Sequence, residues 1–100
     1  AGLKQSLAEI MELPGAIGVA AIDIKSGVMM ACAGMNPDIE IEAAVHADLM
    51  KAKLQAQRTL GKKDSVEDLL ITTVRQFQYL CLVPSAPDTM LFVQLNRRQA

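Results

Sequence analysis

Aromatic residues are scarce in this chain of 100 residues, which has two Phe, one Tyr and no Trp. Its ten Lys and Arg are balanced by eleven Asp and Glu, so the formal net charge at pH 7 is −1. Proteins that bind nucleic acid usually carry a basic surface, and those that hold single strands add aromatic platforms for the bases. The composition therefore predicts a protein that does not bind nucleic acid.

The side chains that most often build catalytic and metal sites are also scarce. His46 is the only histidine, and Cys32 and Cys81 lie far apart without the spacing of a zinc site or a redox pair. We predict buried, reduced thiols, no metal, no cofactor and no catalytic activity. His46 follows Glu42 by four residues, and we expect the two to form a solvated pair on a helix surface.

Long apolar segments are missing as well. No apolar run reaches the roughly 18 to 20 residues that span a bilayer, and the start of the chain has no basic segment followed by an apolar one. We therefore expect no membrane insertion and a cytoplasmic location. The length suits one domain over residues 1–100, and a domain this small gains stability from association.

The residues that are present predict an α+β protein with the order helix, two strands, helix, three strands. Helices are indicated by apolar residues at helical spacing and strands by apolar and β-branched runs between turn residues. Short connections predict an antiparallel hairpin followed by a meander. Asn96 resembles the cap of a third helix that is truncated or frayed. The predicted helices cover residues 3–11 and 37–60, and the strands cover 16–24, 28–33, 66–73, 77–83 and 89–95.

The long helix is apolar on two opposite faces. A helix that lies on its own sheet uses one apolar stripe, so the second stripe needs another molecule. We predict that the stripe containing Ala43 and Ala47 pairs with its copy in a homodimer, because small side chains let two helix backbones come close, while the other stripe packs on the sheet. The predicted dimer stripe is Ile39, Ala43, Ala47, Met50 and Leu54, and the predicted sheet stripe is Ile41, Val45, Leu49, Ala52, Ala56 and Leu60.

Polar side chains fill the arc between the two stripes. They carry both signs of charge, so two paired helices would present an apolar centre with a polar rim, as protein interfaces do. We predict that this arc contacts a protein partner. Its residues are Glu40, Asp48, Lys51, Gln55 and Arg58.

Several segments, together with the order of elements, resemble the roadblock family of dynein light chains and their bacterial relatives. They are the run from Leu13 to Asp23, Ser26-Gly27 at the hairpin, the Ala-rich long helix, and the segment from Glu67 to Thr72. The resemblance spans nearly the whole chain. It implies a five-stranded antiparallel sheet between helices, of roadblock/profilin-like type, and homodimers in which the long helices pair and the third strands meet.

The family resemblance also implies further partners and contacts. Leu69, Leu70 and Ile71 would join the dimer interface, because the resemblance places their strand at a sheet edge. The implied function is a non-enzymatic module that binds or regulates a small Ras-like GTPase, or scaffolds a signalling or motility complex. The alternative is a small-ligand sensor, in which Gly18 and Ala20 leave space for a pocket in the core. A GTPase gene in the neighbourhood of the gene for this chain would support the interaction module. A metabolite retained through purification would support the ligand sensor.

Overall fold

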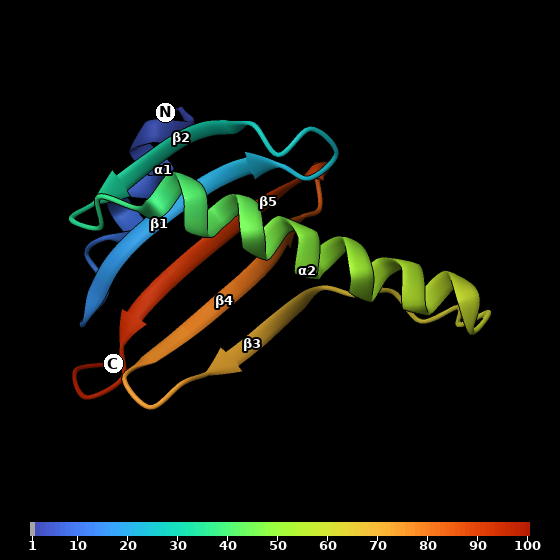
Figure 1. The fold of residues 1–100 in the computed structure, drawn as a ribbon. Coiled ribbons are helices and arrows are strands. Elements are labelled where there is room, and N and C mark those ends of the chain that lie inside the picture. The colour runs from blue at the N-terminus through green and yellow to red at the C-terminus, as the bar shows by residue number, and fades with distance from the viewer. Residues whose placement is uncertain (1) are drawn as a thin grey trace.

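The computed structural model describes residues 2–100 and shows one antiparallel sheet with a helix on each face (Figure 1). The strands lie in the order β2-β1-β5-β4-β3, and each neighbouring pair is antiparallel. This confirms the predicted α+β class and order of elements. The helices are α1 (Leu3–Ile10) and α2 (Ile39–Thr59), and the strands are β1 (Ala16–Asp23), β2 (Met29–Gly34), β3 (Asp68–Thr72), β4 (Gln76–Val83) and β5 (Ala86–Asn96).

The β1–β2 hairpin closes through a glycine and a side-chain hydrogen bond. Gly27 has φ 74°, a conformation that residues with a Cβ adopt at a cost. The Ser26 hydroxyl donates to the Asp23 carboxylate at 2.7 Å. This hydrogen bond is the main cause of a lowered pKa for Asp23, because it favours the ionised carboxylate.

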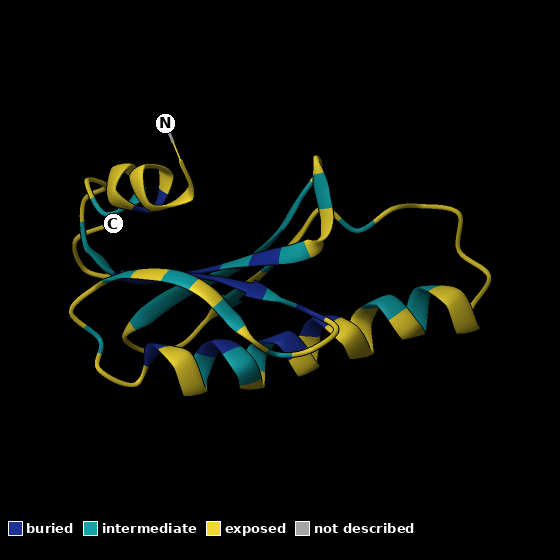
Figure 2. Ribbon diagram, turned by 90° about the horizontal axis from the view of Figure 1, so that it is seen from above, coloured by how far each residue is buried: buried dark blue, intermediate teal, exposed yellow. Residues whose placement is uncertain are grey.

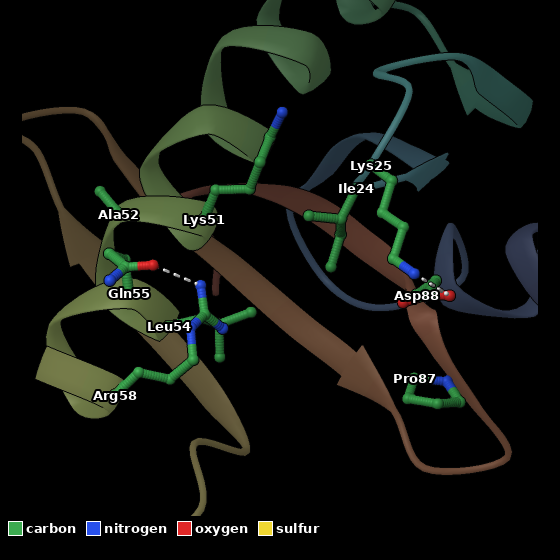
Figure 3. Close-up of a pocket in the computed structure, with 9 residues that line it drawn as sticks. All are labelled: Ile24, Lys25, Lys51, Ala52, Leu54, Gln55, Arg58, Pro87 and Asp88. Atoms are coloured by element: carbon green, nitrogen blue, oxygen red, sulfur yellow. Dashed lines mark hydrogen bonds and ion pairs between the residues drawn. The ribbon is translucent and has the colours of Figure 1, made fainter. Parts of the chain in front are cut away.

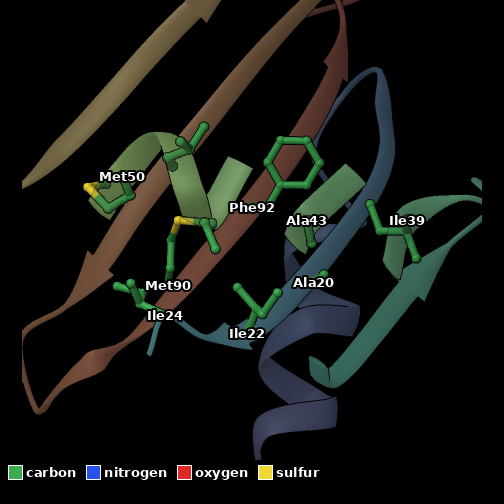
Figure 4. Packing of buried hydrophobic residues seen from close by; sticks show 10 residues of the cluster. Ala20, Ile22, Ile24, Ile39, Ala43, Met50, Met90 and Phe92 are labelled. Carbon is green, nitrogen blue, oxygen red and sulfur yellow. The ribbon is translucent and has the colours of Figure 1, made fainter. Parts of the chain in front are cut away.

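The core has two parts, one on each face of the sheet. On one face α1 packs on β1 and β2, where Leu7 is buried against β1. Figure 2 shows that α1 covers a limited part of this face. On the other face α2 closes the larger cluster, in which side chains from the helix meet the sheet (Figure 4). That cluster contains Ala20, Ile22, Ile24, Ile39, Ala43, Ala47, Met50, Leu80, Met90 and Phe92.

The connection between β4 and β5 is tighter than the sequence pattern predicts. Pro84 and Ser85 form the turn, and Val83 already pairs with Ala86. β5 therefore begins three residues earlier than predicted. Residues 97–99 form a turn in place of the predicted start of a helix. No helix among residues 2–100 is long and apolar enough to cross a membrane.

α2 crosses the sheet diagonally and extends beyond it at its C-terminal end (Figure 1). All fully buried residues of the helix lie between Ile39 and Met50. From Lys51 onward its side chains are half-buried or exposed. The second half of α2 therefore has little of its own chain beneath it.

Candidate protein-interaction site

The structure reverses the predicted roles of the two stripes of α2. Ile39, Ala43, Ala47 and Met50 are buried against the sheet, and Leu54 packs at the edge of the same cluster. The prediction that this stripe forms the dimer interface was therefore wrong, because Ile39, Ala43, Ala47 and Met50 are covered by the protomer's own sheet. The small side chains bring the helix close to its own sheet, not to a copy of itself.

Small residues on β1 explain this choice of face. Gly18 and Ala20 lie under α2, and a Cβ built on Gly18 would be 3.4 Å from both Ile39 Cδ1 and Gln94 Oε1. The helix backbone can approach the sheet because small residues meet small residues there. The space that a ligand sensor would need at Gly18 and Ala20 is thus filled by the protein's own side chains.

The opposite stripe of α2 faces away from the sheet and is exposed. The exposed fractions are 68% for Ile41, 61% for Val45 and 66% for Leu60, and Leu49 is also exposed. A continuous row of large apolar side chains on a surface usually marks an interaction site. The sequence correctly indicated that the sheet can cover only one of the two apolar stripes of α2. The uncovered stripe is the one that contains Ile41 and Val45, which was predicted to lie on the sheet.

β3 lies at an edge of the sheet, as the resemblance implies. Its side chains alternate between the two faces. Leu69 and Ile71 are partly buried against the α2-side core, whereas Leu70 on the other face is 54% exposed. Leu69 and Ile71 therefore belong first to the protomer's own core. The free edge of β3 and Leu70 remain available to a partner.

All five residues predicted to contact a partner are exposed along one side of α2. Lys51 Nζ lies 3.4 Å from Asp48 Oδ1, and Arg58 Nη2 donates to Gln55 Oε1 at 2.8 Å. Glu40 lies near the start of the helix, at the far end of the same side. Since surface ion pairs of this kind contribute little to stability, these groups are free to pair with another molecule at small cost.

A cavity of about 520 Å³ opens beside the second half of α2 (Figure 3). Across it lie the β1–β2 hairpin and the start of β5, where Lys25 Nζ is 3.4 Å from Asp88 Oδ2. Three cationic side chains thus surround an apolar floor. The lining residues are Ile24, Lys25, Lys51, Ala52, Leu54, Gln55, Arg58, Pro87 and Asp88.

The structure brings Lys51, Gln55 and Arg58 together at this cavity, while Glu40 and Asp48 lie outside its lining. Sequence reasoning missed Lys25 and Asp88, which lie on the other wall. Their local sequence marks them only as turn residues. Only the strand order, which brings the β1–β2 hairpin and the β4–β5 turn to the same end of the sheet, places them near α2.

His46 is less solvated than the sequence pattern predicts. Its ring stacks on Phe92 with 4.5 Å between ring centroids, and its Nδ1 lies 2.7 Å from the carbonyl oxygen of Glu42. The Glu42 side chain instead accepts hydrogen bonds from Asn36 and from the buried Gln94. The expected solvated pair was therefore wrong, since both side chains attach α2 to β5.

The side chains most often used for metal binding and thiol chemistry are those of His, Cys, Asp and Glu. No group of three or more His, Cys, Asp or Glu side chains that could hold a metal ion occurs within residues 2–100. Cys81 is half-buried, whereas Cys32 is exposed, so the expectation of two buried thiols was wrong for Cys32. Burial, followed by the charge of Asp68, raises the pKa of the Cys81 thiol and so disfavours the reactive thiolate.

No family model and no curated protein sequence matches the chain. Among solved structures, a roadblock/LC7 domain from Streptomyces avermitilis is similar with a TM-score of 0.82 at 15% identity, over 100% of this chain and 82% of that one. MglB from Myxococcus xanthus is similar with a TM-score of 0.82 at 17% identity, over 97% of this chain and 71% of that one. The gliding protein MglB from Thermus thermophilus is similar with a TM-score of 0.78 at 18% identity, over 100% of this chain and 78% of that one. The chain therefore has the roadblock fold of these bacterial domains, as its sequence resemblance implies.

Proposed function

We propose that the chain is a homodimeric, non-enzymatic interaction module of the cytoplasm that binds or regulates a small Ras-like GTPase, or scaffolds a motility or signalling complex. The observation that carries this proposal is the exposed apolar stripe of α2 with its charged flank. Such a combination has the apolar centre and polar rim of a protein interface. The MglB structures with the same fold include one described as a gliding protein, which supports a motility role.

The homodimer in this proposal forms at β3. An edge strand with an exposed apolar side chain normally needs a cover, and an antiparallel copy of β3 would provide one. The twofold axis of such a pairing is perpendicular to the sheet, so both copies of α2 lie on the same face. Leu60, which directly follows the half of α2 that extends beyond the sheet, would then lie near the second copy.

The partner surface comprises the outward residues of the first half of α2 and the charged flank. Ile41 and Val45 supply the apolar centre, and Lys51 and Arg58 supply cations beside the cavity. Because both copies of α2 lie on one face in the proposed dimer, the two surfaces are continuous. A GTPase that contacts both copies would therefore need the dimer first.

Titration calorimetry against the GTPase captured from the source organism, in both nucleotide states, tests this function. Val45→Glu should abolish binding while the protein remains a folded dimer, because it places a charge at the apolar centre. Leu13→Glu is the matched control, since Leu13 is also exposed but lies outside both α2 and β3. Unchanged affinity for Val45→Glu would remove the outer face of α2 from the proposal.

A further inference from the structure

β2 forms the second free edge of the sheet (Figure 1), and its residues carry no charged side chain. The chain has no Asp, Glu, Lys or Arg between Ser26 and Asp38. The β3 edge differs, since that strand begins at Asp68 and follows Glu67. Edge strands of natural proteins are usually protected by charges, prolines or a covering segment. The uncharged β2 edge is therefore suited to pair with another strand.

The backbone of β2 has unpaired groups on its outer side. Met35 N donates to Ile17 O at 3.0 Å. Because bonded and non-bonded pairs alternate in an antiparallel ladder, the N–H and C=O groups of Cys32 and Gly34 point away from β1. A register shift at the start of β2 also leaves Met30 without a β1 partner. The outward groups of Cys32 and Gly34 are therefore available to a strand added at this edge.

The exposed side chains along this edge are apolar and small or flexible. Met30 is 53% exposed, and Cys32 and Gly34 are exposed as well. Methionine adapts its shape to the surface it meets, and Gly34 adds no side chain to the edge. The edge can therefore accept an apolar strand without a close steric fit.

We propose that β2 pairs antiparallel with β2 of a second copy, in a register centred on Cys32. An identical uncharged segment brings no like charges together, so self-pairing meets no electrostatic repulsion. This register bonds the outward groups of the two Cys32 residues to each other and sets Met30 opposite Gly34. The contact lies at the edge opposite β3 and does not depend on the proposed function. Its short length makes the association weak and dependent on concentration.

Disulfide trapping in the full chain tests this pairing. In Cys81→Ser, Cys32 is the sole thiol. Directly opposed residues of a bonded antiparallel pair have Cα atoms about 5.5 Å apart, which suits a disulfide. Oxidation by copper(II)-phenanthroline should join two Cys32 sulfur atoms. Each new S–S bond releases two protons, and two electrons pass to the copper(II).

Two variants in the Cys81→Ser background separate this pairing from random collision. Met30→Lys should slow cross-linking about tenfold, because it adds charges at the contact. Val74→Lys adds the same charge at an exposed position far from β2 and should leave the rate unchanged. Equal rates for Met30→Lys and its parent, or no cross-linked pair at millimolar concentration, would overturn the proposal.

A third variant keeps this test apart from the β3 dimer. Leu60→Glu is designed to weaken the contact of the proposed function and leaves β2 unchanged. Cross-linking at Cys32 should persist in this variant. Loss of cross-linking here would overturn the claim that β2 forms a separate contact, whereas a failure of the β3 dimer alone would leave the β2 proposal standing.

Discussion

The two apolar faces of α2 differ in where their small side chains lie along the helix, and this placement decides which face meets the sheet. The buried face has Ala43 and Ala47 at its centre, whereas the outer face has Ile41 and Val45. Helical periodicity shows that each face can be covered, but it does not rank them. Small residues allow the helix backbone to approach β1, and the large residues are left for a partner. A helix with two apolar stripes should therefore be oriented by comparing side-chain volumes with those of the facing strand.

The strongest test of this comparison is a charge on the buried face. Ala47→Glu should lower the free energy of unfolding by about 3–5 kcal/mol, because it puts an unpaired carboxylate and extra volume into a packed core. Urea unfolding followed by circular dichroism measures this loss. Val45→Glu, two residues earlier on the outer face, should change the free energy by about 0.5 kcal/mol or less. Similar midpoints for the two variants would mean that α2 does not lie on the sheet by its alanine face.

A charge near the exposed end of α2 should act on assembly instead. Leu60→Glu should raise the dissociation constant of the homodimer about 10- to 100-fold, because an apolar contact is replaced by a carboxylate that must lose water. Sedimentation equilibrium over a range of protein concentrations measures the change. Leu13→Glu, at an exposed residue outside α2, serves as the control. A wild-type protein that is monomeric throughout would contradict the β3 dimer itself.

The charged flank should affect the partner more than the fold. Lys51→Glu combined with Arg58→Glu should weaken GTPase binding about tenfold at low salt, since rim charges steer and orient the partner. The effect should shrink as salt screens the charges. Calorimetry at two ionic strengths measures this difference. The homodimer should persist, so loss of the dimer in this variant would show that the flank belongs to self-association.

The smallest effect is expected at His46. His46→Gln should lower the free energy of unfolding by about 0.5–1.5 kcal/mol through loss of the stack on Phe92, and partner binding should be unchanged. His46→Phe keeps an aromatic ring and should recover most of this loss in the same urea experiment. Reduced GTPase affinity in a folded His46→Gln protein would instead place the imidazole on the recognition surface.

Local sequence predicted the elements well because each has a local cause. Pro14-Gly15 ends the first helical pattern, and Gly27 closes the hairpin. Which residues come together at the site depends, in contrast, on contacts between segments that are distant in the sequence. Lys25 lies at the α2 cavity because of the order of the strands. His46 stacks on Phe92, which is distant in the sequence, and is therefore less solvated than predicted. The close approach possible at Gly18 was visible in the sequence, and matching it to the helix alanines would have identified the buried face.

The odd number of strands in the sheet has a consequence for symmetry. In an antiparallel sheet of five strands, β2 and β3 run in the same direction. A head-to-tail addition, with β2 of one copy beside β3 of the next in the same orientation, would therefore create a parallel pair. A twofold axis perpendicular to the sheet, which brings like edges together, keeps the continued sheet antiparallel. Because of this strand parity, a stack of copies related by translation alone would contain parallel pairs, whereas pairing of like edges about a twofold axis would not.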